Sequence, residues 1–351
     1  MTPPTPPTAD GGPEPQAADP DGPFDAFVVT AEDDRLRCGV SPLTVDDLPP
    51  GEVLVAVDWS AVNYKDGMVT RPGNRVARTS PLVPGVDLVG TVAASEDPDV
   101  RVGAAVIAHG YDLGVARHGG FARFARVPAG WIVPLPEGLT ARRAAALGTA
   151  GFTAALSLRR LEHHGLRPGD GPLLVTGASG GVGGMTVALA AARGYEVVAS
   201  TGRTSEHAYL TGIGAARVIG REDLVVDPER TLGPERWAGA VDCVGGATLA
   251  AVLRTLRYGA AVAASGLTGG NQLETSVYPF IVRDAALLGV DTVQTPVAER
   301  RAVWAELADG VPGEVVDALV EGQVGLHDLA PVLDDILAGQ VRGRMLVRPG
   351  A

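Results

Sequence analysis

The sequence predicts an α/β protein made of two parts. Short Val-rich segments with alternating polar and apolar residues, separated by Gly and Pro, occupy the N-terminal third and indicate a twisted, partly antiparallel β structure. From about residue 148, strand patterns alternate with helix patterns, which is typical of a doubly wound parallel sheet with helices on both faces. The length of 351 residues agrees with two domains.

The N-terminal part follows a proline-rich segment. Residues 1–23 contain eight prolines and no apolar periodicity, so we expect a disordered tail there. The alternating segments that follow predict five strands, at residues 27–30, 53–59, 88–93, 105–108 and 121–127.

The parallel sheet is predicted from a βαβ unit. A helix at residues 149–160 leads to a strand at 173–176, a helix at 181–193 and a strand at 196–201. Strand and helix patterns then continue through residues 217–219, 240–244, 249–257, 260–264 and 286–290.

The C-terminal end returns to the first part of the chain in this prediction. Two helices are expected at residues 299–308 and 329–338, followed by a strand at 344–347 that needs a sheet to pair with. We therefore expect one domain from residues 24–147 together with 297–351, and a second from residues 148–296.

Composition and charge exclude several classes of protein. With 41 acidic and 29 basic residues and a formal net charge of −12, general binding to nucleic acid or anionic lipid is not expected. The longest apolar runs, such as residues 187–192, fall far short of the roughly 18 residues that cross a bilayer. Two cysteines allow neither a disulfide framework nor a four-cysteine zinc site, and they favour the reducing cytoplasm.

A glycine-rich loop lies between the strand at 173–176 and the helix at 181–193. Its sequence is TGASGGVGG at residues 176–184. Glycines let the backbone approach a pyrophosphate, and the helix N-terminus offers free N–H groups and the positive end of its dipole. The sequence therefore predicts a dinucleotide site, held by Ser179, Gly180, Gly181, Val182 and Gly183.

The choice of cofactor is predicted from the end of the next strand. Enzymes that use NAD place Asp or Glu there for the ribose hydroxyl, whereas this chain has Ser200, Thr201, Gly202 and Arg203. Arginine can form a charge-assisted, bidentate contact with a 2′-phosphate, so we predict NADPH. Arg221, after the third strand, could reach the same phosphate. The alternative is that Arg203 is a solvated residue near a helix end.

Several motifs together resemble a known family. SAVNYKD at residues 60–66, PGVD at 84–87, GTAGFTA at 148–154 and TGR at 201–203 resemble the zinc-independent quinone oxidoreductase branch of the medium-chain dehydrogenase/reductase superfamily. WAGAVD at 237–242, SGLTGG at 265–270 and PFIVR at 279–283 resemble its NADPH-dependent acryloyl-CoA reductases. The resemblance covers the chain from Phe24 onward. It implies a GroES-like β-rich catalytic domain and a Rossmann domain.

The resemblance also implies site residues. It brings Asn63, Tyr64 and Thr149 to the nicotinamide and assigns Thr153 to the cofactor site. It also brings Leu267, Ile281 and Thr292 to the cofactor or to the contact with a second subunit. Separately, Arg344 is expected to close over the cofactor, because it lies near the returning strand. An edge strand near residues 287–293 commonly pairs with its mate in this superfamily, so we expect a homodimer.

No metal site is expected. Zinc-dependent relatives carry Cys where this chain has Asn63-Tyr64, and Gly-His-Glu where it has Gly85-Val86-Asp87. The six histidines form no ligand-spaced pair on a helix face. Without a metal to polarise an alcohol, reduction of an activated C=C bond or a quinone is the expected chemistry.

For an enoyl thioester, hydride goes to the β carbon, an enolate forms, and a proton is added at the α carbon. The enolate oxygen needs a hydrogen-bond donor, and the α carbon needs an acid. We predict Tyr64 as that donor or acid, with Asn63, Lys65 and Asp66 completing the catalytic motif. The alternative is that Tyr64 stacks on the nicotinamide while water supplies the proton.

Three arginines follow this motif, and they lead to alternative functions. Arg71, Arg75 and Arg78 could hold the phosphates of coenzyme A, or they could simply solvate a loop. The first function is reduction of acryloyl-CoA or another short-chain enoyl-CoA. The second is an NADPH:quinone oxidoreductase, which needs no CoA phosphate site. The third is a non-catalytic NADPH-binding protein.

Overall fold

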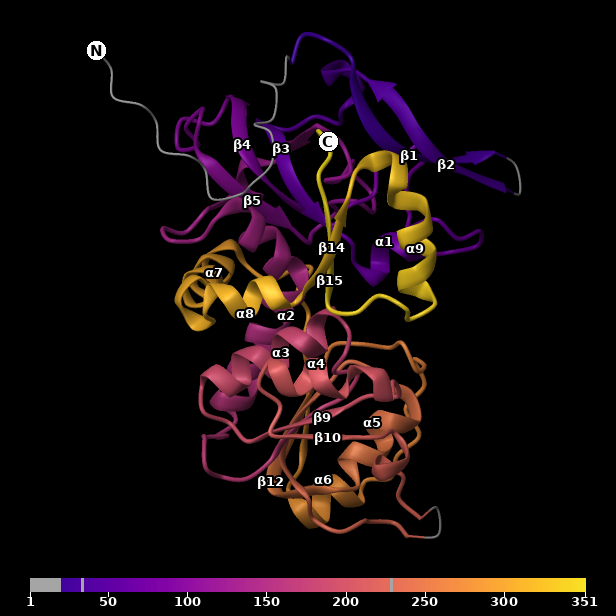
Figure 1. Cartoon of the computed structure of the whole chain (residues 1–351), viewed down its shortest axis with the longest axis vertical. Helices are drawn as coiled ribbons and strands as arrows, with labels where there is room; N and C mark the ends of the chain where they lie inside the picture. The colour runs from indigo at the N-terminus through magenta and orange to yellow at the C-terminus, as the bar shows by residue number, and fades with distance from the viewer. Residues whose placement is uncertain (1–19, 33–34, 228–229) are drawn as a thin grey trace.

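The computed structural model of the chain describes residues 20–32, 35–227 and 230–351. Two lobes follow each other along the longest axis of the molecule (Figure 1). One lobe contains the N-terminal strands and the C-terminus, and the other contains the parallel sheet. Residues 1–19, which form most of the predicted disordered tail, lie outside the described residues.

The first lobe is built on a seven-stranded sheet. Its strands are β3 (Val53–Ala61), β4 (Asp87–Ser95), β5 (Ala105–His109), β6 (Phe124–Val127), β7 (Val133–Pro134), β14 (Val320–Val324) and β15 (Arg344–Val347). The order is β14-β15-β3-β4-β5-β7, and β6 pairs with β3. The pairs of β3, β4, β5, β6 and β7 with one another are antiparallel, as the alternating segments predict.

A separate hairpin packs on this lobe. It consists of β1 (Phe24–Glu32) and β2 (Arg35–Leu43). The sequence predicts only part of β1 and misses β2. Gly39 and Pro42 interrupt the pattern of β2, so its extended conformation depends on pairing with β1.

The second lobe contains a six-stranded parallel sheet. Its strands are β8 (Leu173–Val175), β9 (Val197–Ser200), β10 (Arg217–Ile219), β11 (Trp237–Asp242), β12 (Leu256–Ala264) and β13 (Ala286–Gly289). They lie in the order β10-β9-β8-β11-β12-β13, and every pair is parallel. Together with the largely antiparallel sheet of the first lobe, this confirms the predicted α/β class and the doubly wound sheet.

The longest helix, α2 (Ala141–His163), joins the two lobes. It kinks at Gly148, whose φ of 46° and ψ of −152° are not helical. Its apolar side chains belong to one buried cluster with Trp59 of β3 and Val241 of β11, so one core spans both lobes. A first helical segment, which the sequence does not predict, begins at Ala141, where the Thr140 side chain accepts a hydrogen bond from the Arg143 backbone N. The segment after the kink begins at Thr149, as predicted.

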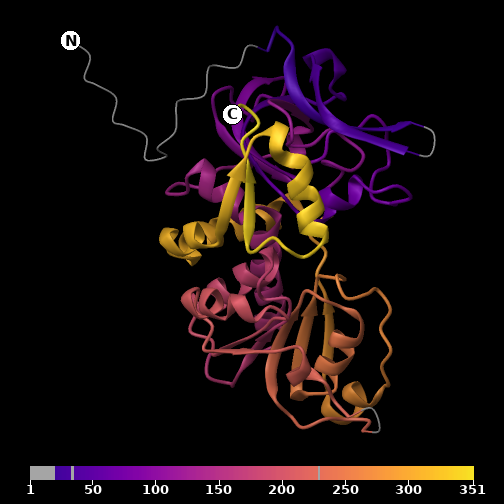
Figure 2. The same cartoon turned by 45° about the vertical axis from the view of Figure 1, so that its right-hand side comes forward.

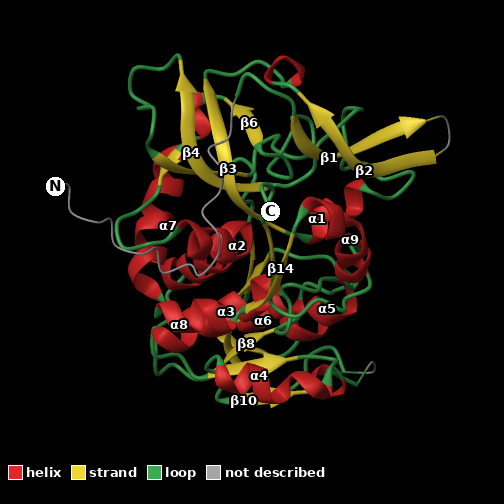
Figure 3. Cartoon of the chain, turned by 45° about the horizontal axis from the view of Figure 1, so that its top comes forward, coloured by secondary structure: helices red, strands yellow, loops and turns green. Residues whose placement is uncertain are grey.

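The remaining helices cover the sheets and the junction (Figure 3). They are α1 (Tyr64–Val69), α3 (Gly181–Ala192), α4 (His207–Gly212), α5 (Gly246–Leu253), α6 (Tyr278–Arg283), α7 (Val297–Gly310), α8 (Gly313–Ala318) and α9 (Leu329–Leu337). Short 3₁₀ turns lie at Val45–Asp47, Ala129–Trp131, Thr204–Glu206, Glu222–Leu224 and Leu326–Asp328. Within the described ranges, no helix combines the length and apolar character needed to span a bilayer.

The end of the chain returns to the first lobe, as predicted for residues 344–347 (Figure 2). β15 pairs antiparallel with β3 and parallel with β14. The sequence does not predict β14, since its five residues, VEGQV, contain only two apolar side chains. This return carries Arg344 from the end of the sequence to the junction of the two lobes.

Candidate active site

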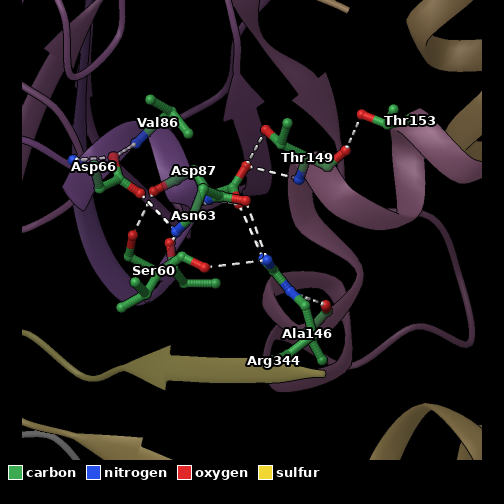
Figure 4. Close-up of polar contacts among 12 residues, drawn as sticks. Ser60, Asn63, Asp66, Val86, Asp87, Ala146, Thr149, Thr153 and Arg344 are labelled. Atoms are coloured by element: carbon green, nitrogen blue, oxygen red, sulfur yellow. Dashed lines mark hydrogen bonds and ion pairs between the residues drawn. The ribbon is translucent and has the colours of Figure 1, made fainter. Parts of the chain in front are cut away.

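Three buried charged side chains meet where the two lobes join (Figure 4). Asp87 is the first residue of β4, Asp66 lies on α1, and Arg344 begins β15. Asp87 and Arg344 are each only 2% exposed, and Asp66 is fully buried. Charges are rarely buried to this extent unless they are paired and hydrogen-bonded, so their contacts define the site.

Asp87 lies at the centre of these contacts. Its Oδ1 accepts hydrogen bonds from the Thr149 backbone N at 2.8 Å and from Thr149 Oγ1 at 2.5 Å. Its Oδ2 accepts from Asn63 Nδ2 at 2.8 Å and from Arg344 Nη2 at 3.2 Å. One carboxylate therefore connects β4, the kink of α2, the start of α1 and β15.

Arg344 points into the protein. Its Nε donates to the Ala146 carbonyl at 2.9 Å, and its Nη1 donates to the Val62 carbonyl at 3.2 Å and to Asn63 Oδ1 at 3.1 Å. Burial lowers the pKa of Arg344, while the charge of Asp87 acts in the opposite direction. The sequence assigns Arg344 to the cofactor, and the structure directs its guanidinium to the Asp87 cluster.

Asp66 fastens the 63–66 motif to the turn before β4. Its carboxylate accepts from the backbone N of Asn63 at 2.8 Å and from those of Gly85 and Val86 at 3.0 Å each. Burial raises the pKa of Asp66 to about 7, helped by the charge of Asp87 and opposed by these backbone donors. A group enclosed in this way positions the motif and is not open to a ligand.

The four motif residues have different exposures. Asn63 Nδ2 donates one hydrogen bond to Asp87 and another, at 3.1 Å, to the Ala61 carbonyl. Both amide protons of Asn63 are therefore used inside the protein. Tyr64 is 36% exposed, and Lys65 is also exposed. Among the motif residues, Tyr64 and Lys65 are therefore the ones that can donate a proton or a hydrogen bond to a ligand.

The predicted dinucleotide loop has the geometry that a pyrophosphate needs. Gly180 is the N-cap of α3, and a glycine offers no side chain to occupy the N–H groups of the first turn. A Cβ at Gly183 would lie 2.3 Å from the Gly177 carbonyl oxygen, so only glycine allows this close packing. Ser179 Oγ and Thr201 Oγ1 lie 3.1 Å apart beside the loop. Backbone N–H groups at residues 181–183 thus fit the phosphates of a dinucleotide.

Two arginines lie near the ends of β9 and β10. Arg203 donates through Nη1 to the Gln340 carbonyl at 3.0 Å and through Nη2 to the carbonyls of Ser179 and Val341, each at 3.3 Å. The Arg221 guanidinium packs on Gly202, where a Cβ would lie 2.5 Å from Arg221 Nε. Arg221 therefore lies where a ribose phosphate near Gly202 would be, whereas the Arg203 guanidinium donates to three backbone carbonyls.

The other predicted cofactor residues are spread more widely. Thr153 is buried and donates to the Thr149 carbonyl at 2.7 Å. The Thr292 carbonyl accepts from Arg300 Nη2 at 2.8 Å. Leu267 and Ile281 are 55% and 72% exposed, on the surface of the second lobe.

Carboxylates partner two of the three arginines assigned to the substrate. Arg71 pairs with Asp334 of α9 at 2.7 Å, and Arg78 pairs with Asp112. Arg75 is exposed between them. Exposed pairs of this kind contribute little to stability, so a ligand with several phosphates could compete for these cations.

Sequence reasoning missed the role of Asp87. In the sequence, Asp87 ends the PGVD motif and stands where a zinc enzyme has another residue, and neither observation assigns it a role. A carboxylate at the start of a Val-rich strand was the available signal, but its partners lie 24, 62 and 257 residues away along the chain. The part of the chain that the structure describes contains no group of three or more His, Cys, Asp or Glu side chains able to hold a metal ion.

Comparison with known proteins identifies the family. Residues 49–137 match the alcohol dehydrogenase GroES-like domain, and residues 181–309 match the family described as zinc-binding dehydrogenase. A protein of Ruegeria pomeroyi named acrylyl-CoA reductase AcuI is 47% identical over 92% of this chain and 98% of its own length. The chain belongs to the medium-chain dehydrogenase/reductase superfamily.

Two further members of this superfamily have solved structures. The putative quinone oxidoreductase YhfP of Bacillus subtilis is 44% identical over 93% of this chain and 98% of its own length. In the comparison with its crystal structure, which has NAD bound, the match covers 93% of this chain and 99% of the YhfP chain, with a TM-score of 0.90. The yhdH oxidoreductase of Salmonella enterica, in complex with NADP, is 44% identical over 92% of this chain and 99% of its own, with a TM-score of 0.89.

Proposed function

We propose that this enzyme uses NADPH to reduce the C=C bond of acryloyl-CoA, or of another short-chain enoyl-CoA, to the saturated thioester. The relative named acrylyl-CoA reductase supports this substrate. One observation carries the proposal: two features lie together where the two lobes join. The first is the start of α3, whose free N–H groups suit a pyrophosphate. The second is the motif at residues 63–66, in which Asn63 and Asp66 bond inside the protein while Tyr64 and Lys65 are exposed.

The residues that would hold the cofactor come from three segments. Backbone N–H groups of Gly181, Val182 and Gly183 take the pyrophosphate, and Arg203 with Arg221 takes the 2′-phosphate. When bound, NADPH supplies the hydride. Two observations support NADPH over NADH: the arginines near Gly202 and the NADP complex of the Salmonella relative. Because YhfP has a structure with NAD bound, the preference for NADPH over NADH needs a direct test, which the Arg203→Gln variant provides.

The protein's own tasks are to hold the enolate oxygen and to deliver a proton to the α carbon. The amide protons of Asn63 are used, and Asp66 is enclosed by backbone N–H groups. We therefore assign the donor role to the Tyr64 hydroxyl, with Lys65 beside it. In the alternative, Tyr64 forms a wall of the site and water gives the proton. Substituting Tyr64→Phe lowers turnover if Tyr64 is the donor and changes it little if water is.

The runner-up function is reduction of a quinone, which the YhfP relative favours. The two substrates differ in the phosphates of coenzyme A, which Arg71, Arg75 and Arg78 would hold. Replacing all three by Ala should raise KM for an enoyl-CoA several-fold and leave KM for a quinone unchanged. An equal KM for acryloyl-CoA in the wild type and this variant would assign the three arginines to the solvated loop.

The deciding experiment follows NADPH oxidation by absorbance with acryloyl-CoA, crotonoyl-CoA and a simple quinone, with NADH as control. Fast turnover of acryloyl-CoA with NADPH supports the proposal. Turnover with the quinone alone rules out the thioester substrate. NADPH binding without turnover of any of these substrates favours the third function, a non-catalytic binding protein.

We also propose that the reaction needs no metal. This chain has Asn63-Tyr64 and Gly85-Val86-Asp87 at the positions where zinc-dependent relatives carry their Cys and His ligands. Activity should be unchanged after dialysis against a chelator, with much less than one zinc per chain by elemental analysis. Loss of activity on chelation, restored by zinc alone, contradicts this.

A homodimer is proposed from the edge of the second lobe. β13 is an edge strand of the parallel sheet, and exposed apolar side chains lie on it and on the segment 267–282 that leads into it, namely Leu267, Val277, Tyr278, Ile281, Val282 and Leu287. Exposed apolar side chains at a sheet edge suit a symmetric contact between two copies. Sedimentation should give twice the chain mass of 35.9 kDa, and Ile281→Glu should give the monomer. Val102→Glu, on the first lobe, is the matched control. A wild-type mass of one chain contradicts the dimer.

Two broader assignments accompany this proposal. We assign residues 24–147 with 297–351 to the catalytic domain and residues 148–296 to the cofactor domain, which the pairing of β15 with β3 supports. We place the protein in the cytoplasm, where the free Cys38 and Cys243 stay reduced. First proteolytic cuts inside residues 148–296 contradict the division, and recovery outside the cytoplasmic fraction contradicts the location.

A further inference from the structure

The hydroxyl group of Thr149 has a fixed hydrogen-bond direction. Its Oγ1 lies 2.5 Å from Asp87 Oδ1, and its backbone N donates to the same oxygen at 2.8 Å. A carboxylate has no proton to offer in return, so the single hydroxyl proton of Thr149 is used inside the protein. On the partly exposed side of the residue, Oγ1 therefore acts only as an acceptor.

Asp87 is held so that it stays turned toward Thr149. Its second oxygen accepts from Asn63 Nδ2 at 2.8 Å and from Arg344 Nη2 at 3.2 Å. Asn63 is itself bound by Arg344 through Oδ1 and by the Ala61 carbonyl through Nδ2. Rotating the carboxylate would break bonds on both of its edges in a buried place, where unpaired polar groups are costly.

Thr149 lies between the two halves of the proposed site. It follows the kink at Gly148, and a Cβ at Gly181, the first residue of α3, would lie 3.4 Å from the Cβ of Ala150. On the other side, Asp87 connects Thr149 to Asn63, which precedes Tyr64. Thr149 is therefore linked to the pyrophosphate position through Ala150, and to the exposed tyrosine through Asp87 and Asn63.

We infer that Asp87 is a positioning residue that fixes Thr149 Oγ1 as an acceptor for the carboxamide N–H of a bound nicotinamide, and so makes the site selective for rings that carry a donor there. This inference rests on the proposed use of NADPH. A purely structural cluster would stabilise the junction of the lobes but would not distinguish two rings of equal size that differ in this donor.

The test is equilibrium binding, by calorimetry, of NADP⁺ and its 3-acetylpyridine analogue. The analogue keeps the ring carbonyl but replaces the amide NH₂ by a methyl group, so it lacks the donor. The wild type should bind NADP⁺ more tightly by roughly three- to tenfold, which corresponds to one net hydrogen bond. In Thr149→Val the ratio of the two dissociation constants should fall to about one, because the acceptor is gone.

Asp87→Ala tests the positioning role itself. It removes the oxygen that accepts the hydroxyl proton of Thr149, so Oγ1 can turn that proton toward the ligand and the preference for NADP⁺ should fall. Ser157→Ala is the matched control, because Ser157 donates to the Thr153 carbonyl on the same helix at 2.7 Å and takes no part in the cluster. The control should keep the wild-type ratio.

Three outcomes overturn the inference: equal binding of both compounds by the wild type, an unchanged ratio in Thr149→Val, or an unchanged ratio in folded Asp87→Ala. Thr149→Val decides alone if Asp87→Ala does not fold. The titrations contain no thioester, so a failure of acryloyl-CoA reduction with the analogue ratio intact overturns the proposed reaction and leaves this inference standing. Absence of NADP⁺ binding overturns both.

Discussion

The guanidinium of Arg300 lies against the ring of His109, with Nη1 3.0 Å from Nδ1, and both side chains are buried. Arg300 also donates to the carbonyls of Thr292 at 2.8 Å, Val293 at 2.9 Å and Thr295 at 3.0 Å. Trp304 Nε1 donates to His109 Nε2 at 3.0 Å from the next turn of α7. Arg300 thus holds the segment that leaves the parallel sheet against the end of β5 in the other lobe.

Arg300→Lys should destabilise the protein although it keeps the charge. Lysine has three donors on one nitrogen and cannot reach all the carbonyls that the guanidinium satisfies, and each buried carbonyl left alone costs roughly 1 to 3 kcal/mol. Urea unfolding should show a loss of at least about 2 kcal/mol. Arg301→Lys is the control, since its side chain is exposed on the same helix. Equal stability of the two variants would show that the contacts of Arg300 contribute nothing.

The buried carboxyl of Asp66 predicts a pH dependence of stability. Its pKa in the folded protein is raised to about 7, mainly by burial, whereas an exposed Asp in the unfolded chain titrates near 3.9. The stabilising effect is complete below pH 4 or so and is lost as pH rises toward 7, because the folded state keeps a proton that the unfolded chain releases. The loss should be no steeper than about 1.4 kcal/mol per pH unit.

Asp66→Asn provides the comparison for this dependence, because the amide does not titrate. The difference in the free energy of unfolding, wild type minus Asp66→Asn, should fall as pH rises from 4 to 7 and then level off. Chemical unfolding at several pH values measures it. A difference that is constant or rises over this range would mean that the three backbone N–H donors outweigh burial.

Gly183→Ala should weaken cofactor binding. The added Cβ would lie 2.3 Å from the Gly177 carbonyl oxygen and 2.7 Å from Ala178 Cα, so the start of α3 must move away from its loop. Overpacking of this kind costs roughly 1 to 3 kcal/mol, which corresponds to about a 5- to 160-fold rise in the dissociation constant of NADP⁺. Gly212→Ala is the control, because its Cβ would meet open space on α4. Unchanged binding by Gly183→Ala would place the dinucleotide elsewhere.

Arg203→Gln should reduce the preference for NADPH over NADH. A charge-assisted hydrogen bond to the 2′-phosphate contributes roughly 1.5 to 3 kcal/mol, so affinity for NADPH should fall by a factor of about 10 to 100 while that for NADH changes little. Fluorescence titration with both cofactors measures the ratio. Arg35→Gln, exposed in the other lobe, serves as control. If both affinities fall equally, Arg203 serves instead to hold the carbonyls of Gln340 and Val341.

Local sequence was sufficient for features whose physical cause is local. The sequence around the glycine loop predicts the geometry of the loop, because a strand, a tight turn and a helix N-terminus follow one another within a few residues. The alternating segments of β3 and β4 and the regular spacing from β8 to β13 likewise predict their sheets. Two strands with a weak alternation of polar and apolar residues are not predicted. In β2, Gly39 and Pro42 interrupt the alternation, and β14 carries few apolar side chains.

The α/β class, the dinucleotide loop and the motif at residues 63–66 follow from the amino-acid sequence alone. What each side chain of this motif does depends on contacts that form when the chain folds. Asn63 and Asp66 are turned inward because Asp87 and Arg344 arrive from distant strands, and Tyr64 and Lys65 are left exposed. The physical reason is that a buried charged group needs hydrogen-bonding partners, and these come from whichever segments the fold brings next to it. The residues around Arg344 in the sequence do not predict that its partner, Asp87, lies 257 residues earlier.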